Sequence, residues 1–222
     1  MNKKKLLLIA LPAAAVIVAL VVVLVLRYTS PDRFVIPDHI VICLDAGHGG
    51  EDPGAVFEGR QEKNDNLNMV LAVRDALERE GHENLTVILT RDEDIPMELA
   101  ARTDFANKQD ATLFVSIHRN SGGGHGVETW ISADGLRPET DLATYIQNNL
   151  KNVGIQKDRG VRKGTASNPH ASYYVVGNTK MPACLVELGF IDSRQDNTLL
   201  DEQADAYAQA IADGILQMVK LK

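Results

Sequence analysis

The stretch VICLDAGHGGEDPGAV, residues 41–56, determines how the rest of the chain is interpreted. An apolar run typical of a buried strand reaches Asp45 and is followed by AGHGG, residues 46–50, around His48. Glycine allows backbone conformations that other residues avoid, and it leaves free space beside a neighbouring side chain. The pattern therefore predicts a strand that ends in a tight turn presenting one imidazole, and the space beside it could hold a ligand, a metal ion or nothing.

Apolar runs and helical periodicities alternate along the rest of the chain. Runs typical of strands lie at residues 39–47, 85–91, 111–118, 126–132, 172–177 and 182–190. Helical spacing with proline or glycine boundary signals lies at residues 67–81, 96–109, 138–153 and 201–220. We expect a loop over residues 158–171. This alternation is typical of a single α/β domain with a mixed, largely parallel sheet flanked by helices.

The first 37 residues differ in composition from the rest. Lysines at residues 3–5 precede the uncharged run LLLIALPAAAVIVALVVVLVL, residues 6–26. Twenty-one helical residues span about 31 Å, enough to cross a bilayer core and more than a signal peptide normally needs. A long buried helix is the alternative. We expect a single-pass transmembrane anchor, preceded by a cytoplasmic basic tail at residues 1–5 and followed by a linker at residues 27–37.

The charge distribution predicts the side of the membrane on which the remaining domain lies, and it argues against a nucleic-acid partner. Basic residues flanking a span stay in the cytoplasm, so residues 38–222 should lie on the extracytoplasmic face of the cell membrane. Four of the 23 basic residues and none of the 30 acidic ones precede Tyr28, which leaves 19 basic and 30 acidic residues after the anchor. Nucleic-acid binding requires clustered lysine and arginine, so we expect no nucleic-acid partner.

The two cysteines lie in separate apolar runs. Cys43 belongs to VICL and Cys184 to PACLV. Outside the cell they could form a disulfide. Two buried free thiols are the favoured interpretation, because nothing in the sequence fixes their separation.

Four residues form a candidate chemical site. His48, His118 and Glu187 each lie at or just past the end of an apolar strand, where α/β sheets bind ligands. Two imidazoles and a carboxylate such as Glu62 are a common zinc set for hydrolysis, and a second carboxylate can carry the proton. Each histidine could instead be structural, and Glu62 could favour a helix N-terminus. Glu187 is harder to explain structurally, because a carboxylate in an apolar strand is costly unless it is paired.

Five segments in order carry a resemblance to a known family. They are LDAGHGGEDPGAV, EKNDNLNMVLAVRDAL, LTRDED, SIHRNS and MPACLVELGFID, and the match runs in order from about residue 40 to 220. The chain resembles the zinc-dependent N-acetylmuramoyl-L-alanine amidases of the amidase-3 family. That resemblance implies a peptidoglycan substrate, in which the amide between the lactyl group of N-acetylmuramic acid and L-alanine is cut.

The resemblance also assigns roles to the candidate residues. His48, Glu62 and His118 match the ligands of one zinc ion, and Glu187 matches the catalytic glutamate that acts as general base and general acid. This implies that residues 38–222 are the catalytic amidase domain.

Arg119 and Asn120, which directly follow His118, are candidates for substrate binding. Arg119, where many members have alanine, could contact substrate carboxylates or be a solvated rim residue. Asn120 could orient the loop or a substrate carbonyl. Two other functions stay open: a non-catalytic wall-binding or regulatory domain on the same fold, and a zinc peptidase acting within the stem peptide.

Overall fold

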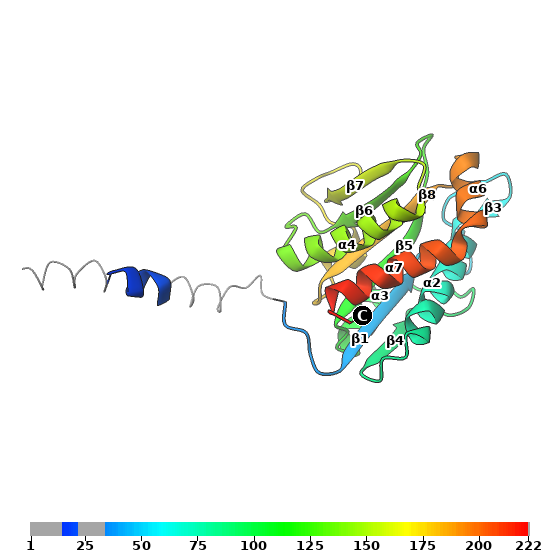
Figure 1. Ribbon diagram of the computed structural model, residues 1–222. Helices are drawn as coiled ribbons and strands as arrows, with labels where there is room; N and C mark the ends of the chain where they lie inside the picture. The colour runs from blue at the N-terminus through cyan, green and yellow to red at the C-terminus, as the bar shows by residue number, and fades with distance from the viewer. Residues whose placement is uncertain (1–14, 22–33, 222) are drawn as a thin grey trace, which may run out of the picture. The chain divides into compact units, whose positions relative to one another are not determined.

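Figure 1 shows the computed structural model of the protein, which describes residues 15–21 and 34–221. Residues 15–21 are helical, and the rest of the predicted anchor at residues 6–26 lies outside the described residues. Within the described ranges, no helix combines the length and the apolar character needed to cross a membrane. From Ile36 onward the chain forms one compact unit.

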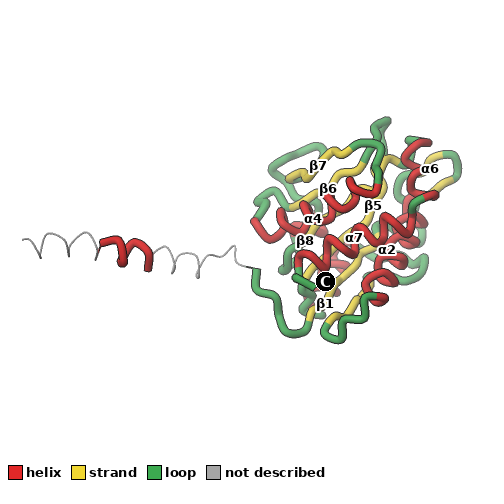
Figure 2. The backbone as a smooth tube through the Cα atoms, in the orientation of Figure 1, coloured by secondary structure: helices red, strands yellow, loops and turns green. Residues whose placement is uncertain are grey.

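A six-stranded sheet forms the centre of this unit, with strand order β4-β1-β5-β8-β6-β7. The strands are β1 (Ile40–Ala46), β4 (Leu85–Leu89), β5 (Leu113–Asn120), β6 (Val127–Ile131), β7 (Asp158–Lys163) and β8 (Ala183–Phe190). Every neighbouring pair is parallel except β6 and β8, which are antiparallel. The prediction of a mixed, largely parallel sheet is therefore confirmed, and Figure 2 shows its strands in yellow between red helices.

Helices cover both faces of the sheet. They are α2 (Glu62–Arg79), α3 (Leu99–Lys108), α4 (Arg137–Val153), α5 (Tyr174–Gly177), α6 (Arg194–Glu202) and α7 (Ala204–Met218). Helices α2, α4 and α7 pack together on one face, and Figure 1 shows α7 lying between the other two. On the opposite face, Ala106 of α3 and Val175 of α5 join Phe114 and Leu185 of the strands in one buried cluster.

The central strands β1, β5 and β8 are almost entirely buried because both faces of the sheet are covered. All eight residues of β8 are buried, which explains the continuous apolar run ACLVELGF. The amphipathic pattern of the last helix is confirmed: Tyr207, Ile211 and Ile215 of α7 are buried. Pro138 lies in the first turn of α4, and Gly154 ends that helix in the left-handed conformation.

Several element predictions were wrong, and each has a physical reason. Residues 172–177 were expected as a strand, but Tyr174–Gly177 form helix α5, whose valines pack against the sheet and override their strand preference. Residues 158–171 were expected as a loop, but Asp158–Lys163 form the edge strand β7, and edge strands tolerate charges.

The sequence analysis did not predict some other elements, and it placed the start of one helix too late. Helix α6 and the short hairpin of β2 (Val56–Phe57) and β3 (Arg60–Gln61) were not predicted, because they bury few apolar residues. Helix α2 begins at Glu62 rather than at Leu67, because its first turn is polar and carries no apolar periodicity.

The cysteines are buried free thiols. Cys43 is on β1 and Cys184 is on β8, with β5 between these strands. Two strand spacings amount to about 9.6 Å, beyond the roughly 7 Å between Cα atoms that a disulfide can bridge. The interpretation as small apolar core residues therefore agrees with the fold.

Candidate active site

The site forms at the carboxyl ends of the three central parallel strands. Side chains alternate between the faces of a strand, so Asp45 of β1, His118 of β5 and Glu187 of β8 all point to the face covered by α3 and α5. His118 and Glu187 are direct register partners. Because β6 runs in the opposite direction, its Glu128 reaches the same edge and pairs in register with Glu187.

His48, Glu62 and His118 come together as the sequence analysis expected. Each offers one ligand atom, and the three atoms lie within 4.8 Å of one another. Oε1 of Glu62 lies 3.3 Å from Nε2 of His48 and 2.9 Å from Nδ1 of His118. Tetrahedral zinc with bonds of about 2.0–2.2 Å places its ligand atoms roughly 3.3 Å apart, so both the donor set and its spacing fit zinc.

Further residues hold the two metal-ligand candidates that lie outside the central strands. Nδ1 of His48 donates to Oδ2 of Asp52 at 2.7 Å, the kind of carboxylate contact that orients a metal-binding imidazole. Oε2 of Glu62 accepts from the backbone N–H of Ala55 at 2.9 Å. Asp52 was not among the predicted site residues. Its position four residues after His48, in the acidic loop, was the only signal in the sequence.

Charges are strongly coupled within this triad. Burial alone would lower the pKa of His48, but hydrogen bonds and charge from Glu62 and Asp52 outweigh it and raise the pKa to about 9. Burial alone would raise the pKa of Glu62, but His118 and His48 hold it well below its usual range. The carboxylate of Glu62 is therefore ionised in the metal-free site, and a cation that binds there meets its negative charge.

Glu187 lies beside this cluster, and its pKa is shifted upward, whereas the pKa of Glu62 is shifted downward. Glu187 is 9% exposed, and its buried Oε2 has no hydrogen-bond partner among the residues that the structure describes. Burial raises its pKa to about 7; Glu62 and Glu128 add to the rise, while His118 and His48 oppose it. A buried carboxylate oxygen without a partner is rare, and at this position it points to a group that meets a water, a metal ion or a substrate.

Two buried arginines fix the loop that carries His48. The side chain of Arg102 donates to the carbonyl oxygens of Ala46 and His48 at 2.5 and 2.7 Å and pairs with Asp45 at 2.8 Å. Arg91 donates to the carbonyls of Ala46 and Gly47 at 2.9 and 3.0 Å. His48 itself has φ of 62°, a left-handed conformation that costs a non-glycine residue energy and that these bonds stabilise.

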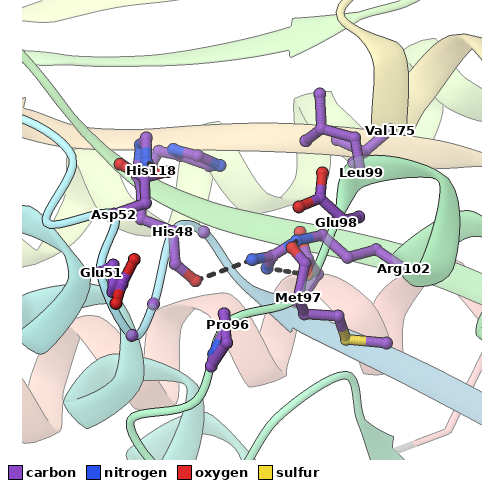
Figure 3. A pocket seen from close by; sticks show the side chains of 14 residues that line it. His48, Glu51, Asp52, Pro96, Met97, Glu98, Leu99, Arg102, His118 and Val175 are labelled. Atoms are coloured by element: carbon purple, nitrogen blue, oxygen red, sulfur yellow. Dashed lines mark hydrogen bonds and ion pairs between the residues drawn. The ribbon is translucent and has the colours of Figure 1, made fainter.

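A cleft of about 640 Å³ opens beside the two histidines. Figure 3 shows His48 and His118 at one end and Leu99 with Val175 at the other, with Arg102 bonded to the loop of His48. Glu98 also lines the cleft. The cleft therefore combines a polar reactive end with an apolar wall. Glu187 is not part of its lining and reaches the site from β8, next to His118.

Arg119 does not lie where a substrate contact was predicted. Its side chain is 1% exposed and pairs with Asp65 of α2, on the opposite face of β5 from His118. It is therefore neither at the cleft nor a solvated rim residue. The prediction went wrong because alternation sends consecutive strand residues to opposite faces.

Asn120 lies at the end of β5 and is half-buried. Its Nδ2 donates to Oε1 of Glu128 at 2.8 Å, and Arg159 pairs with the other oxygen of that carboxylate at 2.7 Å. Glu128 thus organises a polar group next to Glu187. A direct role of Asn120 in substrate binding stays a prediction.

Comparison with known proteins gives a consistent result. A family model described as N-acetylmuramoyl-L-alanine amidase, Amidase_3, matches residues 42–217. The sporulation-specific N-acetylmuramoyl-L-alanine amidase of Bacillus subtilis (strain 168) is 37% identical over 185 residues, covering 82% of this chain and 69% of its own. The N-acetylmuramoyl-L-alanine amidase CwlM of Bacillus licheniformis is 37% identical over 175 residues, covering 79% of this chain and 65% of its own. The chain thus spans about two thirds of the length of these relatives.

Solved structures share the fold. The catalytic domain of CwlV, an N-acetylmuramoyl-L-alanine amidase from Bacillus (Paenibacillus) polymyxa var. colistinus, is 34% identical with a TM-score of 0.74. The match covers 82% of this chain and 99% of that one. The CwlD amidase of Clostridioides difficile, solved in complex with the GerS lipoprotein, is 30% identical with a TM-score of 0.73 over the same shares.

Proposed function

Because the chain belongs to the Amidase_3 family of N-acetylmuramoyl-L-alanine amidases, we propose that it cuts peptidoglycan between the lactyl group of N-acetylmuramic acid and L-alanine. One observation carries the proposal beyond family membership. A His48–Glu62–His118 cluster with zinc-like spacing lies beside Glu187, a buried carboxylate with an unpartnered oxygen. This arrangement supplies both parts that metal-assisted amide hydrolysis requires, a metal site and a separate proton carrier.

His48, Glu62 and His118 would hold one zinc ion, which when bound lowers the pKa of a water molecule and polarises the scissile carbonyl. Asp52 keeps the imidazole of His48 oriented with Nε2 towards Glu62. The carbonyl contacts of Arg102 and Arg91 hold the loop in place before substrate arrives, so the ligand set is pre-organised.

Glu187 would carry the proton. It accepts a proton from the attacking water and returns it to the nitrogen of L-alanine as the amide breaks. A pKa near neutrality suits both steps, because the same group must take and give a proton at working pH. Leu99 and Val175 give the substrate an apolar surface next to the polar end of the cleft.

The test uses the purified full-length chain on purified peptidoglycan, with newly freed N-termini labelled and identified. We expect freed L-alanine, lost on chelation and restored by zinc. Glu187→Gln keeps the size of the side chain but removes the proton carrier, so we expect a roughly 10²–10⁴-fold lower rate with zinc still bound. Freed N-termini elsewhere in the stem would favour the peptidase. Wall binding and zinc binding without any release would favour the non-catalytic domain.

We also propose that residues 6–26 anchor the chain in the cell membrane with the amidase domain on the extracytoplasmic face. The support is the uncharged run and the lysines before it. Full-length chain should remain with washed membranes, and external protease should digest the domain in spheroplasts. A chain that begins at Ile36 should be soluble. Recovery of the full-length chain in the soluble fraction would contradict the anchor.

A further inference from the structure

Arg119 belongs to β5 and contacts α2 and β8, and each of these three elements carries a residue of the candidate site. It follows His118 directly on β5, and its Nη1 pairs with Asp65 of α2, the helix that begins with Glu62. Its Nε and Nη2 donate to the carbonyl oxygens of Gly189 and Phe190 at 3.4 and 3.3 Å, at the end of β8.

From these contacts, we propose that Arg119 is a positioning residue that fixes Glu62, His118 and Glu187 relative to one another and thereby sets the affinity of the site for its metal. The side chain acts from the far face of β5, so it touches neither the metal position nor the cleft. Its backbone N–H also donates to Oε1 of Glu62 at 3.1 Å, which joins this residue to the triad directly.

The burial of the guanidinium supports a positioning role. A charged side chain that is 1% exposed is retained only where its donors are matched. Besides its other contacts, Nη2 donates to Oδ1 of Asn197 on α6 at 2.6 Å. The planar fork of arginine fits several acceptors at fixed angles, which a single ammonium group cannot do.

A second arginine makes this position testable without leaving a buried charge unpaired. Nε of Arg60 contacts the same Oδ2 of Asp65 at 2.7 Å, and its other nitrogens pair with Asp201 of α6 at 2.9 and 2.7 Å. When Arg119 is replaced, Asp65 keeps a cationic partner. We therefore expect Arg119→Ala to fold.

Losing the charge of Arg119 and losing its positioning contacts are expected to change zinc affinity in opposite directions. A cation near the site repels a divalent metal ion, so removing its charge alone would strengthen zinc binding. Losing the contacts that hold α2 and β8 against β5 would weaken it. Outer contacts of metal ligands typically change metal affinity 10–100-fold, so we expect Arg119→Ala to bind zinc at least tenfold more weakly.

The experiment measures zinc affinity of the metal-free full-length chain by competition with a chelating dye, together with thermal unfolding of the metal-free form. The control is Arg79→Ala, which removes an exposed arginine at the far end of α2. Arg119→Lys keeps the charge but not the fork, and we expect it to lose zinc affinity as well. This variant decides the question if Arg119→Ala does not fold. Zinc affinity that is unchanged or higher in the folded variants would overturn the proposal.

Only the activity measurement rests on the proposed amidase function. On peptidoglycan fragments, with zinc saturating, we expect a lower kcat at a KM within about twofold, because the residue lies away from the cleft. If wild type binds zinc but releases no L-alanine, the proposed function fails, while the affinity comparison still decides the role of Arg119.

Discussion

At the scale of single residues, two glycines leave space for the triad of His48, Glu62 and His118. A Cβ atom at Gly47 would lie 2.2 Å from Cε1 of His118, and one at Gly54 would lie 2.6 Å from Oε2 of Glu62 and from Cδ2 of His48. The glycines around His48 therefore make room for imidazoles and a carboxylate.

The residue-scale prediction concerns the substitution Gly47→Ala, which adds a Cβ atom next to His118. The added methyl group would displace the ring of His118, so we expect zinc affinity to fall at least tenfold and stability to fall by about 1–3 kcal/mol. Isothermal titration with zinc and chemical denaturation measure the two effects. The control is Gly59→Ala, where φ is 84° but no atom lies within 4 Å of the added Cβ. It should lose about 1 kcal/mol of stability and no affinity. Normal zinc binding by Gly47→Ala would contradict the assigned geometry.

The raised pKa of Glu187 has a consequence for stability. In the unfolded chain this carboxyl ionises near pH 4.5, whereas in the folded metal-free chain it stays protonated up to about pH 7. Between these values the unfolded state binds fewer protons, so this group makes the fold less stable as pH rises.

We therefore expect Glu187→Gln to gain stability relative to wild type as pH rises from about 4.5 to 7. A shift of this size corresponds to roughly 3 kcal/mol once the pH is above both values. Urea unfolding of both metal-free proteins at a series of pH values measures the difference, because the other titrating groups largely cancel. A difference that does not change with pH would mean that Glu187 ionises at the same pH in the folded and the unfolded chain.

At the scale of elements, the strand-to-loop connection after β1 depends on a buried ion pair. Asp45 and Arg102 have side chains that are 0% and 3% exposed. Burial alone would raise the pKa of Asp45, but Arg102 together with the hydroxyls of Ser116 and Thr90 keeps it below its usual range. The same guanidinium donates a hydrogen bond to the carbonyl oxygen of His48. This one side chain therefore links helix α3 to the loop.

The element-scale prediction concerns Arg102→Ala, which leaves a buried aspartate without its counter-charge. We expect a loss of about 3–5 kcal/mol in the free energy of unfolding, measured by urea denaturation. Arg102→Met combined with Asp45→Asn removes both charges and should recover part of that loss. Arg137→Ala breaks an exposed ion pair with Asp141 and should change stability by no more than about 1 kcal/mol. A loss below about 1 kcal/mol for Arg102→Ala would contradict the importance of the pair.

At the scale of the whole molecule, the sequence predicted the sheet and all four residues that the geometry brings together at the candidate metal position and beside it. His48, His118 and Glu187 could be found because each ends a long apolar run. Glu62 carries no such signal, since it begins a helix whose first turn is polar. It was grouped with the histidines for its chemistry, and the family resemblance then assigned it as a ligand.

What the sequence could not predict depends on contacts between distant segments. Arg119 looked like a neighbour of the site because it follows His118, but the strand directs it to the opposite face. The contribution of Arg102 depends on α3 packing against β1, and no local pattern encodes that pair. Helix α5 and strand β7 differ from their predictions because neighbouring elements, rather than local propensity, decide their conformation.

The position of β8 in the sheet has a consequence for how the chain reaches its folded state. It is the last strand in the sequence, yet it lies between β5 and β6, so the β6–β7 pair joins the sheet only through it. Contacts between segments so far apart in sequence require closure of long loops and form slowly. A nascent chain that ends before Ala183 contains the three residues of the triad but neither Glu187 nor a complete sheet. During synthesis the chain therefore gains Glu187 in the same event that completes the sheet.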